Sequence, residues 1–382
     1  MIGMPPTRVL RWGALGGALA LGTLGLWNDS RLAPRVAIAQ APAPQPPPAL
    51  EVLGFGGDGE SDFTRLLAVS PTGARELGRV IHQPGSSVKG ALLGNGRVAA
   101  VAQRSVARER SWTGALYLLV EGRTETLLDA VYEGSWPVAL DEARVLVARG
   151  TPGLQPVELQ HQQRIDDVFV DEYDVATRTV KRLYQSRGYL ALPIGQHDHQ
   201  TYLADIGPGG VSLVAVTTQG RVRVVADGLQ LARDFSLDKQ RNAVYCQVRH
   251  PRQPSLWQVI EIDLPSGRVQ PVLDGNHYAM VPARWPIDGL LALNPVAGEG
   301  LALFDPSTRR VRQPSFQLGH GIDEVAAVAA DGRGVAILHH GGPARPQLYL
   351  VDAQTQRAFP VPIPREERRF EVVGVVPQGG AR

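Results

Sequence analysis

The sequence predicts an all-β fold, and three observations support that prediction. The stretch from Asp234 to Asp274 contains four short runs of strand-forming residues separated by polar turns. Hairpin patterns of the same kind recur along the chain at nearly regular intervals. No amphipathic helical pattern of useful length follows residue 40. Four strands in about forty residues are typical of one blade of a β-propeller, so a repeated blade is expected.

Seven hairpins carry the repeat, each made of an apolar strand, a polar turn and an alternating strand. They span residues 66 to 81, 116 to 129, 171 to 184, 212 to 227, 259 to 274, 302 to 315 and 348 to 362. The positions just before their turns are separated by 42 to 53 residues. Such a period is typical of a propeller and too long for a solenoid of single helical pairs.

Pairs of nearly continuous Val, Ala and Leu runs lie between the hairpins. They occupy residues 91 to 103, 137 to 150, 235 to 248, 281 to 295 and 325 to 340. Turns such as Gly94-Asn95-Gly96 join the two runs of a pair. Continuous apolar runs predict burial on both faces, so these strands are expected to pack between neighbouring blades.

The two ends of the chain supply the missing strands of one blade. The first hairpin has no pair of inner strands before it, whereas a spare apolar strand from Phe370 to Val376 follows the last one. If that strand joins Leu50 to Phe55, no sheet edge is left open. The sequence therefore predicts a seven-bladed propeller of four-stranded antiparallel blades over residues 50 to 377, closed by pairing of the N- and C-terminal strands.

The N-terminal residues 1–40 predict export. Arg8 and Arg11 precede an uncharged apolar run from Trp12 to Trp27, which is near the length of a secretory signal and at the lower limit of a membrane span. Two alternatives stay open: a signal peptide cleaved near Ala39, or an uncleaved membrane anchor. In both cases the protein is expected outside the cytoplasm, in the periplasm, on the cell surface or secreted.

The rest of the composition adds few constraints. Residues 41–49 form a Pro-rich linker that favours an extended conformation, and residues 378–382 are expected to be a flexible tail. Charged residues make up 20% of the chain with a net charge of +2, which argues against nucleic acid as a partner. The single cysteine, Cys246, lies in an apolar strand and is predicted to be buried rather than reactive. A monomer is expected.

One repeat carries a family resemblance. Phe235-Ser236-Leu237-Asp238-Lys239, then the strand from Trp257 to Asp263 and then Ser266-Gly267, resemble the repeat of TolB-like, WD40-like β-propellers. The stretches from Val69 to Gly73 and from Ala330 to Arg333 are looser copies. The resemblance implies a propeller over residues 50 to 377. For function it implies only a range, which includes periplasmic interaction modules, peptidase-associated propellers and a few lyases.

Loop residues supply the candidate binding surface. In propellers of this kind, the loops between blades and those between the two middle strands share one face, and this face takes seven of the nine histidines. Large aromatics with Arg and His are typical of surfaces that bind proteins, peptides or sugars. The candidates are Trp112, Trp136, Tyr189, Arg233, Arg249, His250, Arg252, His277, Tyr278 and His320. Two alternatives stay open: ordinary solvated loops, or a structural plug in which Trp136 and Tyr278 fill the channel mouth.

Two patterns raise the question of metal binding. His197-x-His199 places two imidazoles on one side of an extended strand. The alternating carboxylates Asp58-x-Glu60-x-Asp62 resemble part of a calcium loop. Turns without a metal are the favoured interpretation of both, so no metal and no cofactor is expected. The sequence contains no nucleophile elbow, P-loop or zinc-protease motif, and no catalytic residue is assigned.

These observations favour an extracytoplasmic, non-catalytic propeller that binds a protein or a cell-envelope polymer through its Arg/His/aromatic loop face. The alternative is a carbohydrate-active propeller enzyme resembling a metal-assisted lyase. Converging carboxylates or histidines inside the channel mouth would favour the enzyme, whereas a flat basic and aromatic face would favour the binding protein.

Overall fold

The computed structural model describes residues 48–104, 113–120, 122–132, 134–150, 168–272, 277–295, 300–341 and 345–380. All of them belong to one compact unit that begins at Pro47. Within these ranges the regular structure is strand, apart from one 3₁₀ turn, η1 (Gly94–Gly96). The predicted all-β class is therefore confirmed. No helix among these residues is long and apolar enough to cross a membrane. The predicted export segment lies outside them.

The strands form antiparallel sheets. The first sheet has the order β28-β1-β2-β3 and is made of β1 (Leu50–Gly57), β2 (Phe63–Ser70), β3 (Gly73–Ile81) and β28 (Arg369–Pro377). An eight-stranded sheet follows, made of β4 (Lys89–Leu92), β5 (Val98–Ala102), β6 (Thr113–Val120), β7 (Arg123–Tyr132), β8 (Val138–Ala139), β9 (Arg144–Arg149), β10 (Phe169–Asp174) and β11 (Thr179–Gln185). Its strands β7 and β9 share one residue pair, Val131 with Arg149.

Four more four-stranded sheets run in chain order. They are β12 (Leu190–His197), β13 (Gln200–Gly207), β14 (Gly210–Thr217) and β15 (Val222–Leu229); β16 (Arg233–Asp238), β17 (Ala243–Arg249), β18 (Trp257–Asp263) and β19 (Val269–Pro271); β20 (His277–Arg284), β21 (Leu291–Pro295), β22 (Ala302–Asp305) and β23 (Arg310–Arg312); and β24 (Ile322–Val328), β25 (Gly334–His340), β26 (Gln347–Asp352) and β27 (Ala358–Val361).

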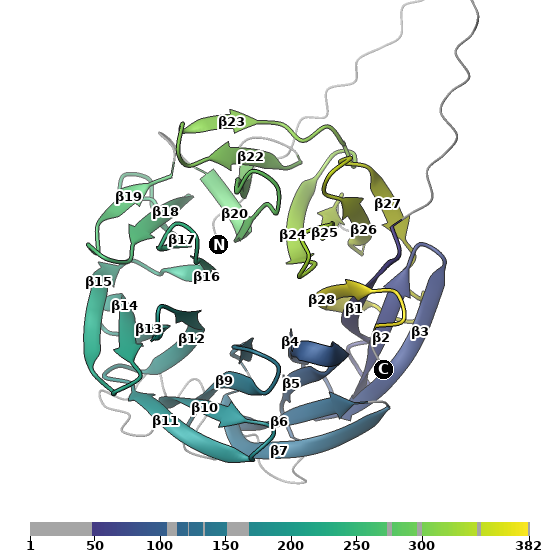
Figure 1. Cartoon of the computed structure of the whole chain (residues 1–382), viewed down its shortest axis with the longest axis horizontal. Helices are drawn as coiled ribbons and strands as arrows, with labels where there is room; N and C mark the ends of the chain where they lie inside the picture. Colours follow the sequence, from purple (N-terminus) through teal and green to yellow (C-terminus); the bar gives the residue numbers. More distant parts are fainter. Residues whose placement is uncertain are drawn as a thin grey trace, which may run out of the picture. The chain divides into compact units, whose positions relative to one another are not determined.

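The sheets of this unit are arranged around a common centre, with β4, β12, β16, β20, β24 and β28 nearest to it (Figure 1). First strands of neighbouring sheets contact one another: β28 contacts both β4 and β24, β20 contacts both β16 and β24, and β12 contacts both β8 and β16. This radial arrangement is the one expected for propeller blades.

The predicted hairpins are all present. They are β2–β3, β6–β7, β10–β11, β14–β15, β18–β19, β22–β23 and β26–β27. Aspartate before the turn explains several of them, because its carboxylate accepts a hydrogen bond from a main-chain N–H inside the turn. Asp263 accepts from Ser266 at 2.9 Å, Asp305 from Ser307 at 2.8 Å, and Asp352 from Thr355 at 2.7 Å.

The predicted pairing of the terminal strands is also present. β1 and β28 pair antiparallel from Leu50 with Pro377 to Gly57 with Arg369, with a register shift at Gly54. Glycine is required at that shift, because a Cβ on Gly54 would lie 2.4 Å from the ring of Phe370. The first and the last segments of the unit thus belong to the same sheet.

Apolar clusters fill the space between sheets. All five residues of β5 are buried, as the continuous apolar run predicts. Cys246 is fully buried in a cluster with Val244, Ile260 and Ile262, so the predicted core role is confirmed. Burial also raises the pKa of its thiol, and that disfavours the reactive thiolate.

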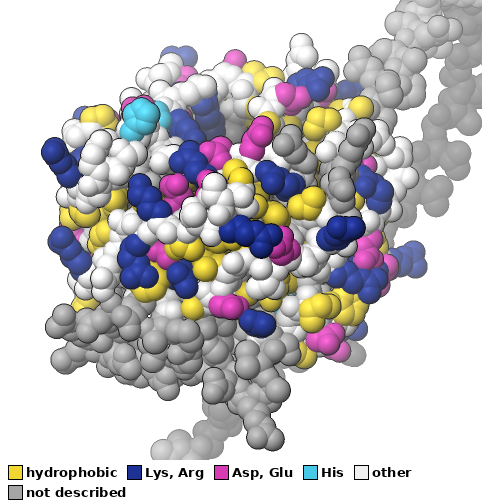
Figure 2. Space-filling model, turned by 60° about the horizontal axis from the view of Figure 1, so that its bottom comes forward, with side chains coloured by type: hydrophobic (Ala, Val, Ile, Leu, Met, Phe, Trp, Pro, Cys, Tyr) yellow, Lys and Arg dark blue, Asp and Glu magenta, His cyan; other side chains and the backbone are white. Residues whose placement is uncertain are grey.

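The outer strands carry a mixture of apolar and basic side chains. The exposed valines Val180, Val222, Val269 and Val311 lie on β11, β15, β19 and β23. Figure 2 turns the lower edge of Figure 1 toward the viewer and shows Lys and Arg side chains interleaved with hydrophobic ones. Charged side chains beside an edge strand discourage pairing with another chain.

Candidate functional site

The connections of the sheets sort into two ends. Because each sheet is an antiparallel meander, the loop between its second and third strands and the loop that leads to the next sheet lie at the same end of the strands. We call this end the loop face. Among the described residues it includes 58–62, 82–88, 134–137, 186–189, 208–209, 230–232, 250–256, 313–321 and 362–368. The tight turns, such as 198–199 and 239–242, lie at the opposite end.

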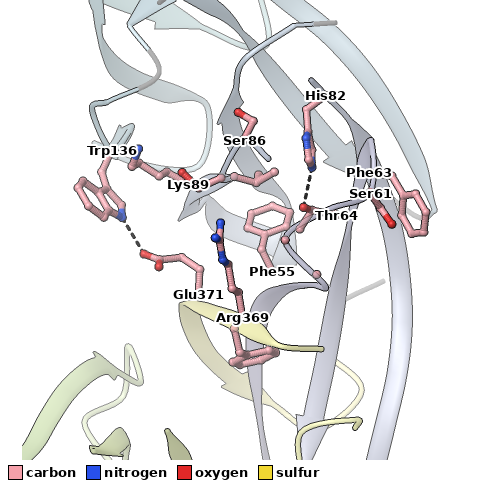
Figure 3. Close-up of a pocket in the computed structure, with 15 residues that line it drawn as sticks. Phe55, Ser61, Phe63, Thr64, His82, Ser86, Lys89, Trp136, Arg369 and Glu371 are labelled. Carbon is pink, nitrogen blue, oxygen red and sulfur yellow. Dashed lines mark hydrogen bonds between the residues drawn. The ribbon is translucent and has the colours of Figure 1, made fainter. Parts of the chain in front are cut away.

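A pocket of about 360 Å³ opens on the loop face. The ends of β1 and β2, the loop before β4, Trp136 and the start of β28 line it (Figure 3). Its charged lining residues are Lys89, Arg369 and Glu371. Segments from the beginning, middle and end of the described chain therefore build one site, which we call the β1–β4 pocket.

Trp136 is the predicted residue that lies in this pocket. Its side chain is exposed, yet its orientation is fixed on two sides (Figure 3). Indole Nε1 donates a hydrogen bond of 2.9 Å to Oε1 of Glu371. The ammonium of Lys89 lies 5.0 Å from the centroid of the ring, which is within the range of a cation–π interaction. The ring is thus held in place while much of its surface remains accessible.

Glu371 supplies the negative charge of the pocket. Burial raises the pKa of its carboxyl group, while the Trp136 hydrogen bond and the Lys89 charge lower it and the charge of Glu324 raises it. Glu324 in turn accepts a hydrogen bond of 3.1 Å from His340. Glu371 of β28 therefore interacts with a second carboxylate, Glu324 of β24, which is itself hydrogen-bonded to His340 of β25.

Arg369 supplies an exposed positive charge. Within the described residues no hydrogen bond or ion pair joins its guanidinium to another group. The neighbouring Arg368, in contrast, pairs with Glu60 at 3.1 Å. Gly59 gives Arg369 its room, because a Cβ on that glycine would lie 3.0 Å from Nε of Arg369.

His82 lies in the wall of the pocket and is buried. Both ring nitrogens are hydrogen-bonded, Nδ1 to the carbonyl of Gln83 at 2.8 Å and Nε2 to the hydroxyl of Thr64 at 2.7 Å. A carbonyl only accepts, so Nδ1 donates to Gln83, whereas the Thr64 hydroxyl can either donate to Nε2 or accept from it. His82 therefore holds the loop in place through both ring nitrogens.

A second cluster places two predicted arginines against Trp257, and two more predicted residues, His250 and Arg252, lie in the adjoining turn. The guanidinium carbons of Arg233 and Arg249 lie 4.0 Å and 4.6 Å from the centroid of its ring. Arg249 also donates to the carbonyl of Pro254 at 2.7 Å. His250 Nδ1 accepts from the main-chain N–H of Arg252 at 3.3 Å, so His250 stabilises the turn.

The remaining predicted residues lie elsewhere. Tyr189 is half-buried and packs against Val168. His320 is exposed and lines a second loop-face pocket, of about 280 Å³. The side chains of His277 and Tyr278, in β20, and the whole of Trp112 lie outside the described residues.

Both sequence patterns considered for metal binding, His197-x-His199 and Asp58-x-Glu60-x-Asp62, lie at turns between strands. Nε2 of His197 is hydrogen-bonded to Oδ1 of Asn242 at 2.5 Å. Asp58 accepts hydrogen bonds from Ser61 and from the N–H of Glu60, and these lower its pKa to about 2. No three His, Cys, Asp or Glu side chains gather closely enough to hold a metal in the part of the chain that the structure describes.

Comparison with known proteins finds similar structures but no matching family or curated sequence. Sqt1 from Saccharomyces cerevisiae matches with a TM-score of 0.51 and 15% identity, over 84% of this chain and 84% of its own. The oligogalacturonate lyase from Vibrio parahaemolyticus matches with a TM-score of 0.51 and 10% identity, over 84% and 93%.

TolB from Acinetobacter baumannii matches with a TM-score of 0.48 and 11% identity, over 85% of this chain. The match spans 66% of TolB, so about a third of that protein has no counterpart in it. Together with the sheet arrangement, the matches to Sqt1 and to the lyase show a β-propeller fold, the fold that the repeat resemblance implies. At such identities the likeness shows the fold alone.

Proposed function

We propose that residues 50–377 form a seven-bladed propeller closed by the pairing of β1 with β28. Division of the eight-stranded sheet at its single Val131–Arg149 pair supports this count, because it yields two four-stranded blades, β4–β7 and β8–β11. Contacts of β28 with both β4 and β24 support the closure.

The proposed function is non-catalytic binding of a protein or a cell-envelope polymer through the loop face. The observation that carries it is Trp136, an exposed indole whose orientation Glu371 and Lys89 fix before any partner arrives. A pre-organised aromatic side chain loses little conformational entropy on binding and is a typical hot-spot residue. The apolar run from Trp12 to Trp27 supports a location outside the cytoplasm.

Binding to separated envelope fractions tests the proposal. Soluble envelope proteins, membranes and cell-wall polymer are each incubated with wild type, with a Trp136→Ala, Arg249→Ala double variant, and with Lys239→Ala. Lys239 is an exposed residue in the turn at the opposite end of β16, so it is the control. One fraction should retain wild type and the control, and at least tenfold less of the double variant. Equal retention of all three proteins would refute binding through the loop face.

A carbohydrate-active enzyme is the second candidate. It is favoured by the carboxylates of Glu371 and Glu324, which interact with each other, and by His340 beside Glu324. The match to an oligogalacturonate lyase gives the reaction class to assay. Ultraviolet absorbance of unsaturated uronic ends detects that reaction. Product formed by wild type and lost in Glu371→Gln would favour the enzyme over the binding protein.

A further inference from the structure

The β1–β4 pocket has aromatic lining residues, among them the exposed Trp136. The carbon-bound hydrogens of a sugar ring pack well against an indole, which is both apolar and able to hold a fixed orientation. Trp136 is 51% exposed although its N–H is already hydrogen-bonded. What remains available for a ligand is therefore the apolar surface of the ring.

The pocket also has a cationic side. Lys89 and Arg369 both line it, against the single acidic group of Glu371. The positive charge of Lys89 is partly balanced by the carboxylate of Glu371, with which it interacts. Arg369 has no acidic partner within the described residues, and its guanidinium can bind a carboxylate with two parallel hydrogen bonds. Among the described lining residues the net charge is positive, which favours an anionic ligand.

Serine residues also line the pocket, at Ser61, Ser86 and Ser87. The hydroxyl of Ser61 donates to Asp58 at 2.6 Å, so its oxygen is left to accept from a ligand hydroxyl. A volume of about 360 Å³ lies at the lower end of the range of ligand pockets, roughly 300–1,000 Å³. One or two sugar units fit that volume better than a long peptide or a folded partner.

We propose that the β1–β4 pocket binds an acidic saccharide unit, with its carboxylate at Arg369 and Lys89 and its ring against Trp136. This inference rests on the proposed binding function and narrows its partner to an anionic polysaccharide. A peptide carboxylate would satisfy Arg369 but would leave the exposed surface of the indole uncovered. A neutral sugar would satisfy the indole but not the arginine.

Calorimetric titration with two matched disaccharides tests the ligand class. Cellobiouronic acid and cellobiose differ only in a carboxylate that replaces a hydroxymethyl group, and acetate supplies the carboxylate without the sugar. Wild type should bind the acidic disaccharide at least tenfold more tightly than either of the other two, because both the ring and the charge are needed. Equal affinity for the two disaccharides, or for acetate, overturns the inference.

Two neighbouring arginines supply the matched variants. Arg369→Ala should lose at least tenfold affinity for the acidic disaccharide and little for the neutral one, since a charge-assisted hydrogen bond is removed. Arg368→Ala should leave both affinities unchanged, because Arg368 pairs with Glu60. Both side chains are exposed, so an unchanged thermal midpoint is expected and confirms that each variant is folded. Equal effects of the two variants would refute a role for Arg369.

The same proteins separate this inference from the function on which it rests. If neither disaccharide binds while the envelope protein fraction still retains wild type but not the Trp136→Ala, Arg249→Ala variant, the ligand class is wrong and loop-face binding stands. If no fraction retains wild type and no disaccharide binds, both proposals fail.

Discussion

At the scale of single residues, the β1–β4 pocket depends on three side chains that constrain one another. Glu371 accepts the indole N–H of Trp136, and Lys89 lies over the indole ring. Each contact is modest, since a cation–π contact at an exposed site contributes about 0.5–1 kcal/mol. Their combined effect is orientation: the ring is fixed in the position in which a ligand meets it.

Glu371 should make anion binding pH-dependent. Burial holds the pKa of this carboxyl above its usual value. As the pH falls from about 7 to about 5, Glu371 takes up a proton earlier than a free glutamate, whereas a sugar carboxylate stays ionised. A protonated Glu371 no longer repels the ligand, so affinity for cellobiouronic acid should rise as the pH falls, by about threefold when protonation is complete, equivalent to a screened repulsion of about 0.6 kcal/mol.

A Glu371→Gln variant isolates this effect. The amide oxygen still accepts the Trp136 N–H, but the charge is gone, so affinity should already be raised at neutral pH and change less with acidification. The other charged or titratable groups here are Lys89 and Arg369, which line the pocket, Glu324, which interacts with Glu371, and His340, which is hydrogen-bonded to Glu324. A rise that persists unchanged in the variant would assign the effect to a group other than Glu371.

The residues of the site were only partly predictable. Trp136 could be selected because a large aromatic side chain in a predicted loop is unusual. Its partner Glu371 lies 235 positions away and was assigned to a strand, so only the fold brings the two together. Arg369 and Lys89 begin strands β28 and β4, where a charged residue usually marks nothing more than a strand end. Trp257 begins strand β18, and its two arginine partners come from β16 and β17, so only the fold brings them against its ring.

At the scale of elements, the connection between β27 and β28 is fastened at both ends. Arg345 donates hydrogen bonds to the carbonyls of Ile363, Pro364 and Glu367, at 3.0, 2.8 and 2.6 Å. The carboxylate of Glu367 is buried and pairs with Arg65 of β2. This loop therefore ties the sheet of β24–β27 to the sheet of β1–β3.

Glu367→Ala should lower the free energy of unfolding by about 2 kcal/mol. Removing one member of a buried ion pair costs about 3–5 kcal/mol. The loss expected here is smaller, because Arg65 is partly exposed to solvent and still has Glu366 as a partner. Glu366→Ala is the matched control: Glu366 lies 3.4 Å from the same arginine but is exposed, so its loss should cost under about 0.5 kcal/mol. Denaturant unfolding measures both. Equal losses would show that burial of Glu367 contributes nothing.

The elements themselves were the most predictable part of the chain. Alternation of apolar residues and the aspartates before turns located all the hairpins, since both signals are local. Strand ends were less predictable because they depend on neighbouring sheets. In the run from 137 to 150, the first strand, β8, has only two residues. In the hairpin at 302 to 315, the second strand, β23, already ends at Arg312.

At the scale of the whole molecule, stability depends on a sheet built from both ends of the described chain. β28 covers the edge of β1, and its Val375 packs in a cluster with Leu50 and Val52. Val376 packs on the other side of the sheet, with Leu53 and Phe55. The strand thus contributes to two interfaces between sheets, and no single blade contains all of its contacts.

Removal of residues 369–382 should therefore cost about 5 kcal/mol or more, from two buried valines and a lost row of main-chain hydrogen bonds. A loss of that size is comparable with the whole stability of many domains, about 5–15 kcal/mol, so the thermal midpoint should fall markedly and the exposed edge of β1 should promote association.

Removal of residues 378–382 alone is the control, since it takes away only contacts such as Gln378 with Ala49. A synthetic strand of residues 369–380 added to the longer truncation should restore the midpoint, because the register with β1 is set by the Gly54 shift. An unchanged midpoint in the longer truncation would show that the propeller is held without its terminal pairing and that closure lies elsewhere.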